Sequence, residues 1–119
     1  MHESLEEVQQ WMARWSTWVV RSEGRLVGAV RGRLEDTPVG PAWDIGRIMV
    51  APDLQGRGLG RLLLEHIQAV AAPEATSYVL FTGARSTDNI RMYKKAGFRV
   101  RTDLEAPPLA VMLTKPRTP

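Results

Sequence analysis

The residues best suited to chemistry form a short glycine-rich segment at positions 55–61, which reads QGRGLGR. Glycine allows backbone conformations that are closed to other residues, so successive N–H groups can point at one bound anion. The helix expected after this segment adds the partial positive charge of its N-terminus, and Arg57 and Arg61 add full positive charges. The segment therefore predicts a phosphate-binding loop, better suited to a pyrophosphate than to a single carboxylate.

Three kinds of glycine-rich loop can be compared with this segment. A P-loop needs Lys followed by Ser or Thr after its last glycine, where this chain has Arg61 and Leu62, and a dinucleotide fingerprint needs glycine at position 61. The pattern Gln/Arg-x-x-Gly-x-Gly/Ala is satisfied by Gln55, Gly58 and Gly60. On this pattern the chain resembles the GNAT N-acetyltransferases, in which the loop holds the pyrophosphate of coenzyme A. The alternative is a strand-to-helix turn whose glycines serve only geometry.

A second segment strengthens the resemblance. Residues 86–98, STDNIRMYKKAGF, are similar to the family segment that ends in Tyr, two or three variable residues, Gly and Phe. Together with the order of helices and strands given below, the resemblance covers nearly the whole chain. Where the family commonly has Asn seven residues before the Tyr, this chain has Ser86, and Asn89 stands four residues before Tyr93. Either side chain could contact the cofactor, and Asn89 is favoured because residues four apart share a helix face.

The resemblance implies that acetyl-CoA is the cosubstrate and that the backbone of residues 48–50 pairs with its pantetheine arm. The residues that would contact the cofactor are Ile48, Met49, Val50, Gln55, Gly56, Arg57, Gly58, Leu59, Gly60, Arg61, Ser86 and Asn89.

Attack of an amine on a thioester needs a neutral amine and a proton for the departing thiolate. A lysine-like amine with a pKa of about 10.4 is neutral in only about one molecule in 2,500 at pH 7. By resemblance, Tyr93 is the general acid near the sulfur of coenzyme A; the alternative is a tyrosine that only packs a helix against the sheet. Asp44 lies six positions before Val50, where histone-type members carry their catalytic glutamate.

Asp44 would act as the base directly or through a water chain. The alternative is a solvated acid at a strand end, paired with an arginine. Strand alternation would place residues 44, 46, 48 and 50 on one face, provided that no bulge intervenes.

The elements that must position these residues follow from hydrophobic periodicity and from turn signals. We expect a helix over residues 4–15, a hairpin of strands 18–21 and 26–34, a loop over 35–41, a strand over 43–50, a helix over 59–71, a strand over 78–82, a helix over 87–96, and strands over 98–102 and 109–114. This order is similar to the GNAT fold, an α/β (α+β) fold with a mixed central sheet and flanking helices, but lacks the family's usual first strand and first helix. Residues 1–119 would form a single domain.

Composition narrows the choice of partners. The net charge of +3 comes from positive residues scattered among acids, with no basic run rich in aromatics, so nucleic acid is not expected as a partner. The chain has no cysteine and two isolated histidines, so no metal site is expected. There is no long apolar run or signal peptide, and a cytoplasmic protein without a membrane partner is the default. An uncovered sheet edge favours a homodimer, although a fragment of a larger protein would show the same gap.

The function expected from these observations is transfer of an acetyl group from acetyl-CoA to a primary amine of a small molecule or peptide, by direct attack in a ternary complex. One alternative is a catalytically silent acyl-CoA sensor or interaction module with the same fold. A second is a nucleotide-binding fold that is unrelated to acyltransferases and would bind ATP or NADH.

Overall fold

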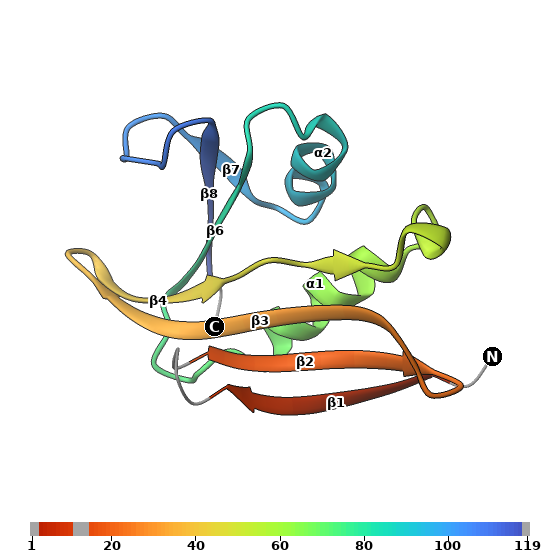
Figure 1. Cartoon of the computed structure of the whole chain (residues 1–119). Helices are drawn as coiled ribbons and strands as arrows, with labels where there is room; N and C mark the ends of the chain where they lie inside the picture. The colour runs from red at the N-terminus through yellow and green to blue at the C-terminus, as the bar shows by residue number, and fades with distance from the viewer. Residues whose placement is uncertain (1–2, 11–14, 118–119) are drawn as a thin grey trace. The chain divides into compact units, whose positions relative to one another are not determined.

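The computed structural model describes residues 3–10 and 15–117 (Figure 1). Within these residues the strands are β1 Glu3–Gln10, β2 Trp15–Ser22, β3 Arg25–Thr37, β4 Gly40–Ile45, β5 Met49–Val50, β6 Ser77–Gly83, β7 Arg99–Arg101 and β8 Ala110–Pro116. The helices are the 3-10 helix η1, Pro52–Leu54, and the α-helices α1, Leu59–Ala69, and α2, Thr87–Lys95. The strand order is β1-β2-β3-β4-β6-β8-β7, and β5 pairs with β3 off this path. The fold is mixed α+β, as the sequence predicted.

The chain divides into two compact units. The first comprises residues 1–33 and 45–71, and the second comprises residues 34–44 and 72–119. None of the helices in the described residues is long and apolar enough to cross a membrane.

In the first unit, β1 pairs with β2 from Glu3↔Ser22 to Gln10↔Trp15, and β2 and β3 form a hairpin. Strand β5 adds to β3 through the pairs Gly28↔Val50 and Ala29↔Met49. Helix α1 lies along β3, where a Cβ on Gly28 would stand 3.1 Å from Leu63 Cδ1. Glycine at this position therefore lets the helix approach the sheet closely. The apolar residues buried in this unit include Val20, Val30, Leu59, Leu63, Leu64 and Ile67.

In the second unit, β8 pairs with β6 on one side and with β7 on the other, antiparallel in both cases. Phe98, which precedes β7, is buried and its ring contacts Tyr93 of α2 and Tyr78 of β6, at centroid distances of 6.1 and 6.5 Å. These three rings join α2 to the strands. The helix ends before Gly97, whose φ of +98° is the left-handed conformation typical of a glycine that terminates a helix.

The helix expected over residues 4–15 is wrong. Residues Glu3–Gln10 form β1, and Trp15 begins β2; the expected helix over residues 11–14 lies outside the described residues. All eight residues of β1 pair with β2, and this long antiparallel ladder overrides a weak local helix pattern carried by a few apolar residues. One more strand therefore precedes the hairpin than the sequence predicted.

The prediction of a loop over residues 35–41 is also wrong, except at residues 38 and 39. Strand β3 continues to Thr37 and β4 begins at Gly40, so only two residues connect them. The Thr37 hydroxyl donates a hydrogen bond to the carbonyl oxygen of Gly40 at 2.6 Å, which closes a tight turn around Pro38. The strand expected over 43–50 is interrupted at residues 46–48, between β4 and β5. The hairpin of β2 and β3, both α-helices and the later strands are confirmed.

Candidate functional site

The glycine-rich segment forms a left-handed entry to α1. Gly56 and Gly58 both have φ of +82°, and Gly58 is the residue that caps the helix N-terminus. A Cβ at either position would meet nothing within 4 Å, so it is the backbone conformation that requires glycine there. Gly58 supplies no side-chain cap, and the first N–H groups of an α-helix have no intrahelical acceptors. The loop therefore has the backbone features of an anion site.

The two arginines of this loop differ in whether they pair with a carboxylate. Arg61 donates from Nε to Glu65 Oε1 at 3.1 Å, an exposed ion pair along α1. Arg57 is exposed, and its charge helps to lower the pKa of Asp53. Gln55 donates from Nε2 to the carbonyl oxygen of Val50 at 3.5 Å, which links the loop to β5. Of the two arginines that the sequence singled out, Arg61 thus has a carboxylate partner of its own.

An ion pair that the sequence did not reveal anchors the approach to the loop. Arg25, at the start of β3, donates from Nη1 to Asp53 Oδ2 at 2.8 Å and from Nη2 to Asp53 Oδ1. Asp53 belongs to η1, directly before the loop, and the hydrogen bond from Arg25 is the main reason why the pKa of Asp53 falls to about 2. The two residues are 28 positions apart, so no local sequence pattern could indicate their pairing.

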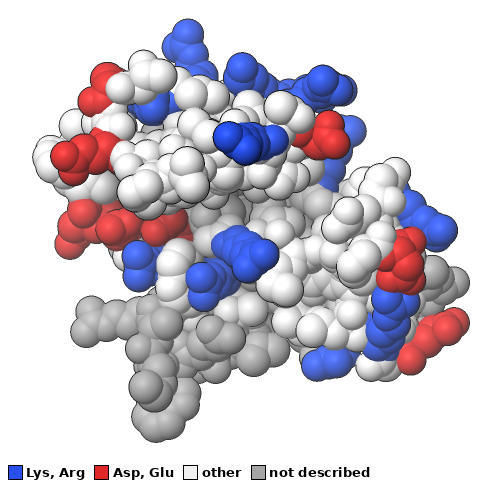
Figure 2. Space-filling model, turned by 45° about the horizontal axis from the view of Figure 1, so that its top comes forward, with Lys and Arg blue, Asp and Glu red and all other residues white. Residues whose placement is uncertain are grey.

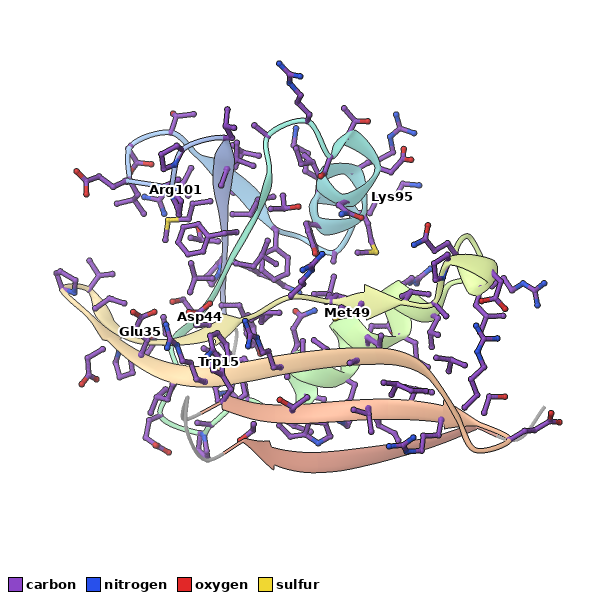
Figure 3. All side chains as sticks on the ribbon, viewed as in Figure 1. Trp15, Glu35, Asp44, Met49, Lys95 and Arg101 are labelled. Carbon is purple, nitrogen blue, oxygen red and sulfur yellow. The ribbon has the colours of Figure 1, made fainter. Side chains whose placement is uncertain are left out.

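Residues 48–50 lie beside the loop in the first unit. Met49, labelled in Figure 3, is exposed, while Ile48 and Val50 are half-buried. Val50 and Met49 pair with Gly28 and Ala29 of β3, and the N–H of Ala51 donates to the carbonyl oxygen of Val27 at 2.8 Å. The segment predicted to pair with pantetheine is thus held on β3, and the hydrogen bond from Gln55 to Val50 links it to the predicted pyrophosphate loop.

Tyr93, in the second unit, is buried to 6% exposure on α2. Burial raises the pKa of its phenol above the usual value of 10. In the described part of the chain its hydroxyl has no hydrogen-bond partner, whereas its ring packs on Phe98. The ring therefore packs α2 against the strands, as in the alternative considered from the sequence. The hydroxyl stays protonated at neutral pH and is available as a hydrogen-bond donor.

Ser86 and Asn89 belong to the same helix as Tyr93. Ser86 occupies the N-cap of α2, and its side chain makes no capping hydrogen bond. Asn89 is exposed, one helical turn before Tyr93. A shallow hollow of about 450 Å³ runs along α2 and includes none of these predicted site residues; it is lined by Thr87, Ile90, Arg91, Lys94 and Lys95.

Asp44 is buried at 7% exposure near the end of β4 (labelled in Figure 3). Residues 42–45 are all buried, so both faces of this strand are covered and the idea of a solvated acid is wrong. The strand is interrupted after Ile45, and the N–H of Gly46 donates to the carbonyl oxygen of Arg31 at 2.7 Å, so the continuous strand that the expected alternation required is not present.

On the face of the molecule drawn in Figure 2, positive and negative side chains are interspersed. Among the residues that the structure describes, no group of three or more His, Asp or Glu side chains could hold a metal ion.

Comparison with known proteins identifies relatives of this chain. The profile of the Acetyltransferase (GNAT) family matches residues 1–98. A peptidyl-lysine N-acetyltransferase of Salmonella typhimurium is 27% identical over 118 residues, which cover 80% of this chain and 79% of the relative. A mycothiol acetyltransferase of Cellulomonas flavigena is 31% identical over 103 residues, which cover 77% of this chain. The chain spans only 29% of that longer relative.

A solved structure shows the same fold. The GNAT family acetyltransferase of Elizabethkingia anophelis with acetyl-CoA bound superimposes with a TM-score of 0.78, over 97% of this chain and 98% of that one, at 17% identity. At this level of identity the likeness concerns the fold.

Proposed function

The chain belongs to the GNAT acetyltransferase family, and we propose that it transfers an acetyl group from acetyl-CoA to a primary amine of a small molecule or peptide, by direct attack in a ternary complex. Family membership makes it an enzyme of the acyl-CoA N-acyltransferase type. The single observation that carries the proposal is the loop at residues 56–58, where two left-handed glycines lead into a helix N-terminus without a side-chain cap.

The loop fits the pyrophosphate of coenzyme A for electrostatic reasons. Its free N–H groups and the positive end of α1 favour an anion, and Arg57 adds an exposed full charge. The side chain of Gln55 makes a long, exposed hydrogen bond to Val50, which connects the loop to the segment proposed for pantetheine, Ile48–Val50. In this proposal Leu59, Gly60 and Arg61 contribute the first turn of α1, and Ser86 or Asn89 contributes a polar contact from α2.

Tyr93 is proposed as the general acid. In the reaction the amine nitrogen bonds to the acetyl carbon, the carbon–sulfur bond breaks, and the thiolate needs a proton. A thiol has a pKa of about 8.5 and a phenol one of about 10, so a tyrosine donates a strong hydrogen bond and transfers its proton at a small penalty. Burial raises the pKa of Tyr93, which keeps the phenol protonated at neutral pH but widens the gap to the thiol, so the hydrogen bond to the thiolate is the larger part of the proposed role.

Asp44 is proposed as the group that accepts the proton of the incoming ammonium, directly or through a chain of water molecules. Its burial near the end of β4 supports a role other than that of a surface acid. Replacement by Asn removes the acceptor, and we expect kcat to fall at neutral pH and to recover partly at high pH, where the amine deprotonates by itself.

The first test is a calorimetric titration of the purified protein with acetyl-CoA and coenzyme A, using ATP and NADH as controls. Binding of the first two ligands alone supports the proposal, whereas ATP or NADH binding of equal strength would contradict the assignment of the loop. Amines can then be screened by the release of thiol, because the chain contains no cysteine and gives no background. Turnover of any amine excludes a silent sensor.

Three expectations about the whole molecule remain proposals. We propose a single domain, since the family profile spans residues of both units, and a single cooperative unfolding transition would support it. We also propose a homodimer that covers β1, which stands at one end of the strand order. Light scattering on the purified protein would measure its mass. A cytoplasmic location is the third expectation.

A further inference from the structure

Two arginines and a tryptophan form a cluster on one face of the first unit. The guanidinium carbons of Arg31 and Arg33 lie 4.6 and 4.3 Å from the centroid of the Trp15 ring (labelled in Figure 3). Arg31 and Arg33 are two positions apart on β3 and so point to the same face of the sheet. Trp15 comes from β2, next to Ser16, which pairs with Gly32. All three side chains are half-buried.

The cluster contacts the break between β4 and β5. A Cβ at Gly46 would stand 2.5 Å from Arg31 Cγ, 2.8 Å from Arg31 Nε and 3.1 Å from Trp15 Cζ3. A side chain at position 46 would therefore displace Arg31 or Trp15. Glycine here allows the backbone of the break to lie directly against the cluster.

Arg31 lacks the kind of partner that other arginines of the described residues have. Arg25, Arg61 and Arg101 each bind a carboxylate. Arg31 Nε is buried and has no hydrogen-bond partner, and no carboxylate partner of Arg31 is present among the described residues. A buried donor without an acceptor is destabilising, and the loss is larger when the donor is charged. A bound anion would supply the missing acceptor.

The cluster is close to the segment proposed to hold the reacting end of the cofactor. Arg31 stands two residues after Ala29, which pairs with Met49 of β5, and two residues span about 7 Å along a strand. The break that contacts Arg31 leads directly into Ile48 and Met49. A group bound by Arg31 would thus lie beside the proposed pantetheine segment, within the same unit of the structure.

We propose that the acceptor amine carries an anionic group, a carboxylate, and that Arg31 binds this group with the charge of Arg33 and the ring of Trp15 beside it. This inference rests on the proposed function, and it names the class of acceptor. A guanidinium presents parallel N–H donors that match the two oxygens of a carboxylate, and stacking on tryptophan restrains the guanidinium without using its N–H groups.

The test compares acceptors that carry or lack the anion, with each rate divided by the fraction of neutral amine, because a carboxamide lowers the pKa of the neighbouring amine. Amino acids and their carboxamides are assayed with acetyl-CoA by thiol release, and aminoalkyl phosphonates form a third arm. We expect the wild-type protein to prefer the acid over its carboxamide by about tenfold or more in kcat/KM, the size of one charge-assisted hydrogen bond. Equal use of acid and carboxamide would overturn the inference. A preference for the phosphonate would support an anion site and overturn the carboxylate assignment.

Two variants separate binding of the anion from general effects. Arg31→Gln should lower the ratio of kcat/KM for the acid to kcat/KM for the carboxamide by about tenfold or more, mainly through a higher KM for the acid, since only the acid uses the lost contact. Arg99→Gln removes the same charge from an exposed position on β7 and should leave kcat/KM unchanged for both the acid and the carboxamide. An unchanged ratio of acid to carboxamide in Arg31→Gln would contradict the inference.

A binding measurement makes the outcome independent of turnover by the variant. Titration of the wild-type protein with an N-acetylated amino acid should shift the Nε–Hε NMR signal of Arg31, and the matching N-acetylated carboxamide should not. A signal that does not respond to the acid would overturn the site. Turnover of amines without discrimination refutes this inference alone, whereas binding of acetyl-CoA with no amine acetylated at all refutes the proposed function as well.

Discussion

Replacement of Gly58 by alanine tests the loop at its central position. Gly58 has φ of +82°, and a Cβ there meets nothing within 4 Å, so the cost to the free protein is conformational. Forcing an ordinary residue into this region costs about 1–2 kcal/mol. If the loop keeps its shape, this strain is the same with and without ligand and cancels in the binding free energy. Any loss of affinity then reports a contact between ligand and loop.

Gly24 provides a matched control. It has φ of +81°, nothing lies within 4 Å of its Cβ position, and it belongs to the turn between β2 and β3. We therefore expect Gly24→Ala and Gly58→Ala to lower the free energy of unfolding by a similar amount, about 1–2 kcal/mol. Only Gly58→Ala should weaken coenzyme A binding, by about tenfold to a hundredfold if one or two hydrogen bonds to a charged phosphate are lost.

The assay is chemical denaturation for both variants, followed by calorimetric titration with coenzyme A. Wild-type affinity in a folded Gly58→Ala protein would refute the assignment of the loop to the pyrophosphate. An equal loss of coenzyme A affinity in Gly24→Ala would show that the effect comes from general destabilisation. The result for Gly58→Ala would then no longer support the assignment of the loop to the pyrophosphate.

Three further predictions concern single side chains. Tyr93→Phe keeps the ring packed on Phe98 and should lower kcat about a hundredfold with coenzyme A affinity unchanged; an unaltered kcat would leave Tyr93 with packing alone. Asp53→Asn should weaken coenzyme A binding in titration, while Asp103→Asn, which breaks a similar exposed pair, should not; equal effects would dismiss an anchoring role. Burial lowers the pKa of His66 below 6.5 in the folded protein. The contribution of His66 to the free energy of unfolding is therefore fully present above pH 6.5 and is lost as the pH drops through the folded-state pKa. His66→Phe should abolish that acid-side decline in denaturation curves, and an identical decline in both proteins would exclude His66 as its source.

The parts of the fold that the sequence predicted well are those whose signals are local. Helix α1 lies within the range 59–71 expected from its apolar residues, and the hairpin of β2 and β3 encloses the turn at Glu23 and Gly24. Local signals failed where pairing between strands decides the outcome. Residues Glu3–Gln10 carry a helical pattern, but their backbone groups bond to β2, and Pro38 sits in a two-residue turn rather than in a long loop.

The candidate site divides in the same way. The left-handed glycines at 56 and 58 are visible in the sequence because the conformation itself requires the residue type. The pairing of Arg25 with Asp53 and the contact of Arg31 with Trp15 join different elements, and no spacing rule connects them. Burial of Asp44 depends on what covers both faces of β4, which periodicity within one strand does not report.

The residues that matter for the acceptor should be sought away from the two motifs. By their names, the relatives from Salmonella and Cellulomonas act on a peptidyl lysine and on mycothiol, although each is about 30% identical to this chain. A loop for pyrophosphate and an acid for the thiolate serve what such reactions share, so neither can distinguish one amine from another. Discrimination needs groups that contact the variable part of the acceptor. Arg31 is half-buried, its Nε is buried without an acceptor, and it has no carboxylate partner among the described residues. It lies beside the proposed pantetheine segment and has the chemistry to contact an anionic part of the acceptor.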